Sequence, residues 1–305
     1  IEKMSQQGTI RRYYIIVEQV KGDRFPSFSE LKECLAQEGF DVSDRTIQRD
    51  IEQIRIEFGV EISYNRNRNG YYIDFEKSIN LASFIRFIEL VNTANIITES
   101  LQDSKKTLEY ISFDTEGGLI GIDNLKPLLK AARESIVVTF EHISFQQNTV
   151  KPYRIQPYLL KEYQNRWYVF GRVEGLNDFR TFGIERIKNL KLTSEKFVRN
   201  EKVNPVEMFK NTIGLVYSNS TLQRVVLSFT PQQGNYIKTL PLHSSQKTLI
   251  DNDKETRISI DVIPNYELTQ QILKHGDRVR VIEPEWLKNE VETTLYKALK
   301  NYNNN

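Results

Sequence analysis

The sequence predicts an α+β fold divided among several domains, and three observations lead to that prediction. A chain of 305 residues is long enough for two or three domains of ordinary size. Apolar side chains recur at helical spacing in residues 10–58 and again in residues 286–302, whereas residues 136–192 alternate as strands do. With 39% hydrophobic and 27% charged residues, the composition is typical of a folded globular protein.

The composition also argues against several classes of protein. No apolar run approaches the roughly 20 residues that span a bilayer, and no secretory signal is visible, so we expect no membrane partner. Cys34 is the only cysteine, which excludes a disulfide within the chain and favours a cytoplasmic, nucleoid-associated location. The three histidines are far apart, and no phosphate-binding loop or nucleophile elbow is present. We therefore expect no cofactor, no metal and no enzymatic activity.

Charge is distributed unevenly along the chain. The sequence has 42 basic and 40 acidic side chains, a net charge of +2. Residues 1–75 have a net charge of −2, residues 76–120 of −3, residues 121–200 of +6 and residues 201–305 of +1. The positive excess therefore lies in the β-rich middle region, where it favours an anionic partner.

Residues 1–75 predict three helices followed by a β-hairpin. Ser27 and Glu30 have the spacing of a capping box at the start of the second helix, and Ser43 is a favoured N-cap for the third. Two alternating strands flank residues 65–70, which end in Asn-Gly, a hairpin signal. Two short helices joined by a tight turn and followed by a hairpin are typical of a winged helix-turn-helix.

The third helix and the hairpin carry side chains suited to DNA. Arginine can donate two hydrogen bonds to guanine, glutamine can pair with adenine, and a helix N-terminus favours phosphate. Two arginines without an acid at the hairpin tip suit a phosphate backbone or a minor groove. We expect a homodimer that binds a double-stranded DNA operator, with half-sites about one helical turn or a multiple apart. The predicted DNA-binding residues are Ser43, Arg45, Thr46, Gln48, Arg49, Arg66 and Arg68.

The alternative for this region is a three-helix bundle with a hairpin that binds protein. The net charge of −2 is compatible with that interpretation. Most of the acidic residues, however, lie outside the expected DNA-facing side, and we expect Asp50 to pair with a neighbouring arginine.

The remaining residues predict a linker and two further domains. Residues 76–120 read as a helical linker ending in a glycine-containing hinge at 114–121. In residues 121–200, short strands with close turns predict a small, strongly curved sheet or barrel, and the proline-containing strand at 150–163 is expected to be bent or at an edge. Residues 201–305 mix strands and helices as an α+β domain. The elements expected there are strands at 225–229, 258–262 and 279–282 and helices at 268–274 and 286–302.

Three stretches of the chain resemble one bacterial family over nearly its whole length. They are Ser-Asp-Arg-Thr-Ile-Gln-Arg-Asp-Ile at 43–51, Arg-Trp-Tyr-Val at 166–169 with Phe-Arg-Thr-Phe-Gly-Ile-Glu-Arg-Ile at 179–187, and Ile-Leu-Lys-His-Gly-Asp-Arg-Val-Arg-Val-Ile-Glu-Pro at 272–284. The chain looks like a WYL-domain transcriptional regulator. Val169 stands where the naming motif has leucine, and Glu185 where the family usually has aspartate.

The resemblance implies both an architecture and a function. The implied domains are a winged helix-turn-helix at 1–75, a helical linker at 76–120, an SH3-like β-barrel WYL domain at 121–200 and a C-terminal α+β WCX domain at 201–305. WYL domains are thought to sense nucleotides or nucleic-acid fragments and so adjust DNA binding. The basic middle region agrees, because arginines bind phosphate and aromatic rings stack on bases.

Strand alternation helps to select ligand-binding residues in the middle region. It places Trp167 and Tyr168 on opposite faces, and we expect Trp167 in the core and Tyr168 toward the site. The predicted ligand-binding residues are His142, Arg154, Tyr168, Arg180 and Arg186.

These residues also have structural interpretations. Arg180 and Arg186 could instead pair with Glu162, Glu174 or Glu185 or support a dimer interface, and the histidine could be a structural side chain. For the whole chain, the alternative function is a nucleic-acid-binding accessory factor in the DNA damage response or phage defence, without promoter control.

Overall fold

The computed structural model shows a mixed α+β protein and describes residues 2–79, 81–103, 120–145, 147–176, 178–217 and 220–303. The chain divides into two compact units, residues 1–115 and 116–305. The end of the expected linker helix and most of the expected hinge, residues 104–119, lie outside the described residues. None of the helices that the structure describes has the length and apolar character needed to cross a membrane.

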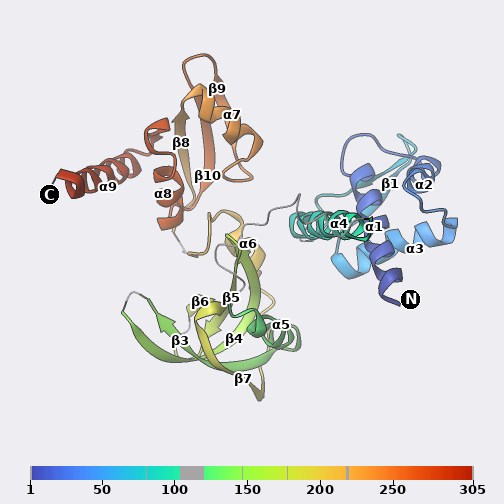
Figure 1. Ribbon diagram of the computed structural model, residues 1–305, viewed down its shortest axis with the longest axis horizontal. Helices are drawn as coiled ribbons and strands as arrows, with labels where there is room; N and C mark the ends of the chain where they lie inside the picture. Colours follow the sequence, from blue (N-terminus) through green and yellow to red (C-terminus); the bar gives the residue numbers. More distant parts are fainter. Residues whose placement is uncertain are drawn as a thin grey trace. The chain divides into compact units, whose positions relative to one another are not determined.

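The described residues of the first unit form four helices and a two-stranded hairpin (Figure 1). The elements are α1 (Glu2–Val20), α2 (Phe28–Gln37), α3 (Asp44–Phe58), β1 (Ile62–Asn65), β2 (Gly70–Ile73) and α4 (Leu81–Asp103). The strands are antiparallel, with Tyr64 opposite Tyr71. Three helices followed by a hairpin is the predicted order of elements.

Local sequence signals set the helix ends. Ser27 Oγ accepts a hydrogen bond from the Glu30 backbone, and the Glu30 carboxylate accepts one from the Ser27 backbone. Ser43 caps α3 by accepting from the backbone N–H of Thr46. Gly59 ends α3 with a φ of 67°, a conformation that glycine adopts without steric cost. The predicted capping box and the N-cap at Ser43 are both confirmed.

The core of the first unit includes the expected linker helix. Ile16, Leu35 and Ile47 are fully buried where α1, α2 and α3 meet. Phe84 and Ile88 of α4 join the same core. The sequence predicts at 76–120 a helical connector that packs against neighbours or a second subunit. In the structure, α4 packs against the helices of the first unit, because these two side chains complete its apolar interior.

A five-stranded antiparallel sheet forms the first part of the second unit. Its elements are the 3₁₀ turn η2 (Ile122–Asn124), α5 (Leu125–Glu134), β3 (Ile136–Ser144), β4 (Thr149–Tyr163), β5 (Arg166–Val173), β6 (Asp178–Gly183), the 3₁₀ turn η3 (Ile184–Arg186) and β7 (Ile187–Lys196). The strand order is β6-β5-β4-β3-β7, and no pairing between β6 and β7 closes the sheet among the described residues. Only η3 separates β6 from β7, so the two edges approach each other at that corner. The predicted SH3-like barrel is therefore seen as a strongly curved open sheet.

Both faces of this sheet are packed. Val138 and Val169 lie in the core that α5 covers, and Phe170 faces the opposite core, which includes Phe209 of the short helix α6 (Pro205–Lys210). Strand β4 lies inside the sheet, and its register with β5 shifts after Pro157. The strand was expected to be bent or at an edge of the sheet. The register shift agrees with a bend, whereas the edge position is wrong.

The second part of the unit is a four-stranded antiparallel sheet with helices. Its elements are β8 (Gln223–Phe229), α7 (Pro231–Thr239), β9 (Lys247–Asp251), β10 (Thr256–Val262), α8 (Tyr266–Leu273), the 3₁₀ turn η4 (Gly276–Arg278), β11 (Val279–Glu283) and α9 (Glu285–Asn303). The β-α-β-β-α-β sequence with strand order β11-β8-β10-β9 is a split βαβ arrangement. Leu227 and Ile260 are fully buried in its core. The expected strands and helices of this α+β region are present.

Candidate functional site

The predicted DNA-binding side chains of α3 lie on its solvent side. Arg45, Gln48 and Arg49 are exposed, as their i, i+3, i+4 spacing predicts for one side of a helix. Ile47 and Ile54, on the other side, are fully buried. No ion pair joins either arginine to a carboxylate in the part of the chain that the structure describes. The guanidinium groups of Arg45 and Arg49 are therefore available to a partner.

One acidic residue of α3 is withdrawn from this surface, while the exposed Glu52 and Asp44 are paired with Arg55 and Lys32. Asp50 is 1% exposed and accepts hydrogen bonds from Arg12 of α1 at 2.6 Å and 3.1 Å. This bidentate pair confirms the expectation that Asp50 binds an arginine. Because the carboxylate is neutralised inside the unit, it does not oppose an anion at the exposed side of α3.

The start of α3 is held by its own capping groups. Ser43 Oγ accepts from the Thr46 backbone and lies 3.0 Å from Thr46 Oγ1. Asp44 pairs with Lys32 of α2 at 2.6 Å. The hydroxyl groups of Ser43 and Thr46 thus serve the helix cap, and the longer side chains of α3 are the better placed to reach a partner.

The hairpin presents two arginines at a structured tip. The side-chain oxygen of Asn65 accepts hydrogen bonds from the backbone of Asn67 and Arg68, which fixes the turn. Arg66 is exposed, and the Arg68 guanidinium lies 4.4 Å from the centre of the Phe25 ring. These contacts define the conformation of the tip.

The base of the hairpin is fixed to the loop between α1 and α2. The Tyr71 backbone donates a hydrogen bond to Pro26 O at 2.8 Å. A Cβ at Gly70 would lie 1.8 Å from Phe25 O, so only glycine allows this close approach. The hairpin consequently has a set position relative to α2 and α3.

A second cluster of polar side chains lies at the η3 corner of the curved sheet. Arg186 Nε is 3.4 Å from Glu185 Oε1 but makes no hydrogen bond. Glu185 Oε2 and the Nε2 atom of His142 are also buried without a hydrogen-bond partner among the described residues. Buried polar groups are normally satisfied, and each unsatisfied one costs about 1–3 kcal/mol. Three such atoms at one corner favour a site that a ligand completes.

Electrostatics link the members of this cluster. Burial, together with Arg186, lowers the pKa of His142 to about 4. Burial, together with Glu185, raises the pKa of the Tyr168 hydroxyl. Tyr168 is half-buried opposite Gly183, at the end of β6. The structure therefore brings three of the predicted ligand-binding residues, His142, Tyr168 and Arg186, into one neighbourhood.

The other two predicted ligand-binding residues lie elsewhere on the sheet. Arg154 of β4 forms ion pairs with Glu174 and Glu195. Arg180 of β6 is exposed and lies 3.8 Å from Asp178. Arg154 is therefore occupied by two carboxylates, and neither arginine joins the cluster at η3.

Two further residues belong to the surroundings of this cluster. Arg166 Nη1 lies 3.8 Å from Glu185 Oε1. Lys161 stands opposite Tyr168 in the β4–β5 register, and burial lowers its pKa. The sequence offered a signal for Arg166, since it directly precedes the naming motif, but none for Lys161, whose position depends on strand register. Trp167 packs against the core, as expected.

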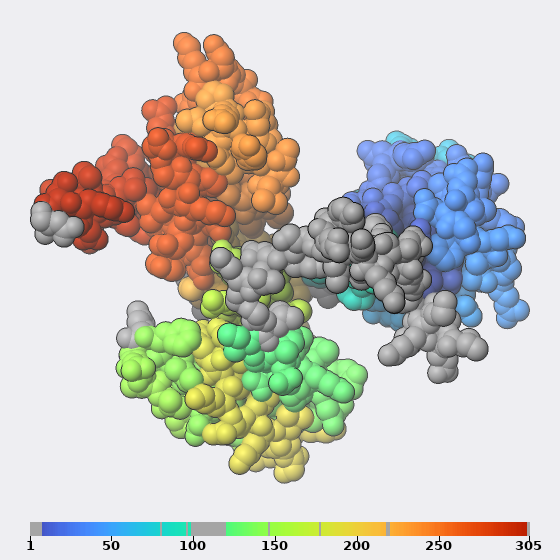
Figure 2. All heavy atoms as spheres, viewed as in Figure 1, coloured from blue at the N-terminus to red at the C-terminus, as the bar shows by residue number. Residues whose placement is uncertain are grey.

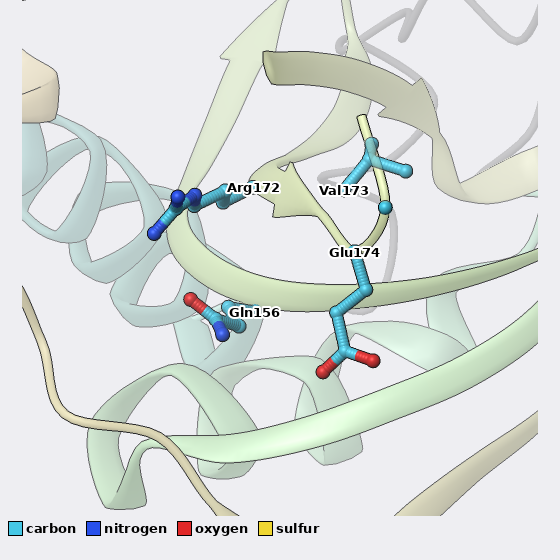
Figure 3. A pocket seen from close by; sticks show the side chains of 5 residues that line it. Gln156, Arg172, Val173 and Glu174 are labelled. Carbon is cyan, nitrogen blue, oxygen red and sulfur yellow. The ribbon is translucent and has the colours of Figure 1, made fainter. Parts of the chain in front are cut away.

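A separate pocket of about 360 Å³ opens at the other end of β5 (Figure 3). Gln156, Arg172, Val173, Glu174 and Gly175 line it. None of the predicted ligand-binding residues is in this lining. Because both an arginine and a glutamate contribute, the pocket has no clear preference for an anion. Among the described residues, no group of three or more His, Cys, Asp and Glu side chains could hold a metal ion.

Comparison with known families and structures identifies two parts of the chain. The WYL domain model matches residues 123–192, and the WCX domain model matches residues 221–299; no catalytic family is among the matches. No curated protein sequence matches the chain. Neither domain model covers the helices and hairpin of the first unit.

Solved structures show more distant similarity. Proteasome accessory factor B/C (PafBC) of Arthrobacter aurescens is 16% identical with a TM-score of 0.28, over 93% of this chain and 45% of that one. The chain thus spans less than half the length of that protein. A CRISPR Cas-related protein is 13% identical with a TM-score of 0.42, over 97% of this chain and 85% of that one. The two domain-model matches show that the chain contains a WYL domain followed by a WCX domain.

Proposed function

We propose that this protein is a bacterial transcriptional regulator that binds double-stranded operator DNA through its first unit and senses an anionic ligand through its WYL domain. The observation that carries the proposal is the separation of charge around α3. Arg45 and Arg49 are exposed without a described carboxylate partner, while Asp50 is buried against Arg12. Residues 1–75, whose net charge is −2, thereby present a basic surface on α3.

The DNA-binding step uses two elements of the first unit. Helix α3 enters the major groove, where Arg45, Gln48 and Arg49 reach base edges. Arg66 and Arg68 of the hairpin contact the phosphate backbone beside it. The fixed hairpin base supports this assignment, since it keeps the two contacts at a constant separation. As a homodimer, the protein reads an operator with two-fold symmetry.

The sensing step uses the cluster at η3. A nucleotide or nucleic-acid fragment offers phosphate oxygens to Arg186 and Arg166 and a base that can stack on an aromatic ring. Its polar atoms also satisfy groups that the folded chain leaves without partners, such as His142 Nε2. His142 is neutral at pH 7, so the arginines supply the positive charge of the site.

Sequencing of genomic DNA bound by the purified protein tests the regulatory function. The wild type is expected to enrich discrete sites with two-fold symmetry. Arg49→Ala is expected to lose about 1–3 kcal/mol of specific binding, the usual contribution of a bidentate base contact. Arg86→Ala, which removes an exposed arginine of α4, serves as the matched control and is expected to bind as the wild type does.

Two outcomes decide against this function. Unchanged operator affinity of Arg49→Ala would show that α3 does not read DNA. Diffuse binding, or a preference for single strands, would instead support the accessory role in DNA damage response or defence.

A further inference from the structure

Helix α9 projects from the domain to which it belongs (Figure 1). Helix α9 has 19 residues and is therefore about 28 Å long. Only Leu287 and Val291, in its first half, are buried. The second half extends beyond the sheet and helices of its own domain (Figures 1 and 2, red).

This projecting half keeps the apolar side of the helix. Leu295 and Leu299 continue the four-residue spacing of Leu287 and Val291, but they are 45% and 56% exposed. Tyr302, one turn further, is 82% exposed. Single exposed apolar side chains are common, whereas a continuous row of them marks a surface that a partner covers.

The charges of α9 select the kind of partner. Residues 285–294 contain three glutamates and one lysine, a net charge of −2, and residues 295–303 contain two lysines and no acid, a net charge of +2. A second copy of the helix lying antiparallel would place each acidic half against a basic half. It would also align the two helix dipoles favourably. A parallel copy would place like charges together.

One pair of charged residues fits such an arrangement. Glu292, Tyr296 and Lys300 are spaced by four and share one side of α9, next to the leucines. Lys300 Nζ lies 5.1 Å from the centre of the Tyr296 ring. No ion pair joins Glu292 or Lys300 to another side chain that the structure describes. Both charges are therefore available to a second chain.

We propose that the second half of α9 is a homodimer interface, in which it packs antiparallel against α9 of a second copy. With a two-fold axis beside Tyr296, Leu295 and Leu299 alternate with the same residues of the second copy. Glu292 then stands opposite Lys300 of the second copy at both ends. This inference rests on the proposed function in one respect, because it identifies the surface that forms the dimer expected to read a two-fold operator.

The small size of this surface limits the expected affinity of the dimer. Four exposed apolar side chains on each copy supply less than the about 800 Å² per partner of a standard interface. A dimer held by α9 therefore dissociates measurably when one leucine is changed. The exposed position of these leucines also means that their replacement leaves the domain folded.

Sedimentation velocity of the full chain over a range of concentrations tests the interface. The wild type is expected to be dimeric at micromolar concentration. Leu299→Glu is expected to weaken the dimer by at least about 30-fold, because symmetry places the change in the interface twice, and 30-fold corresponds to about 2 kcal/mol. Asn301→Glu, on the side of α9 away from Leu295, Leu299 and Tyr296, is the matched control and is expected to stay dimeric. Unchanged thermal unfolding of each variant confirms that the helix is intact.

Charge reversal tests the antiparallel geometry. Glu292→Lys and Lys300→Glu are each expected to weaken the dimer, and the double variant is expected to restore it, since the reversed charges again face each other. A monomeric wild type, or a Leu299→Glu dimer as tight as the wild type, overturns the interface. Failure of the double variant to recover overturns the antiparallel pairing.

The same samples separate this inference from the proposed function. A monomeric wild type that still binds its operator contradicts the α9 interface and leaves DNA binding in place. A dimer that depends on Leu299 but binds no DNA supports the interface and contradicts the regulator.

Discussion

At the scale of single residues, the Arg12–Asp50 pair reconciles the acidic composition of the first unit with a basic surface on α3. Both side chains are buried, so removal of one partner leaves an uncompensated charge in the interior. We expect Asp50→Ala to lower the free energy of unfolding by about 3–5 kcal/mol. Asp44→Ala, which removes an exposed carboxylate, is the control and is expected to have a far smaller effect. Equal urea unfolding curves for the two variants would contradict the structural role of Asp50.

His142 makes the stability of the WYL domain depend on pH. Its pKa is about 4 in the folded chain and about 6.5 when unfolded, because burial and Arg186 disfavour the charged form. Between these values the unfolded chain binds the extra proton, so stability falls as the pH drops from about 6.5 to 4, by up to about 3 kcal/mol, and is unaffected by this group above that range. Thermal unfolding of His142→Phe across the same range is expected to lack this component. An identical pH profile in both proteins would refute the assignment.

At the scale of elements, the hairpin depends on the absence of a side chain at Gly70. An added Cβ would collide with the Phe25 backbone, which cannot move aside as a flexible side chain can. Gly70→Ala is expected to destabilise the first unit by more than the about 1 kcal/mol of an average substitution and to weaken DNA binding. Gly22→Ala has open space around it and serves as the control. Melting temperature and operator affinity are measured for both variants. Values for Gly70→Ala equal to those for Gly22→Ala would contradict this role of Gly70.

Elements with a buried side could be predicted from the sequence, and those without one could not. The capping residues Ser27 and Ser43 and the apolar side of α3 predicted the helices of the first unit. Strand β9 was missed because it is an edge strand whose side chains are almost all exposed, which leaves no alternation to detect. Helix α7 was missed because it buries only Gly234 and Ile237.

The candidate ligand site could be predicted only in part for a related reason. The resemblance to WYL domains selected five residues, and the η3 corner gathers three of them. Alternation assigns a residue to a face of the sheet, but it does not show how far along a curved strand two residues approach each other. Nor does it show that Glu174 and Glu195 occupy Arg154, since that contact joins β4 to residues near the ends of β5 and β7 that are distant in sequence.

At the scale of the whole molecule, the net charge of +2 conceals two different surfaces. The first unit is acidic in total yet exposes arginines on α3 and at the hairpin tip, a combination that limits non-specific attraction to DNA. Residues 121–200 hold the positive excess and contain the η3 cluster, whose buried polar atoms lack hydrogen-bond partners among the described residues. Binding of an anion there can regulate DNA binding only if the ligand favours one arrangement of the chain over another.

Operator affinity with and without a 5′-phosphorylated single-stranded oligonucleotide tests this account most directly. For the wild type, the oligonucleotide is expected to change the operator Kd by about 5- to 150-fold, the usual range of coupling between sites. Arg186→Ala is expected to bind the operator normally and to lose the response, while Arg133→Ala, which removes an exposed arginine of α5, keeps it. A wild-type Kd that the oligonucleotide leaves unchanged, or a full response in Arg186→Ala, would contradict the claim that the η3 cluster is the sensor.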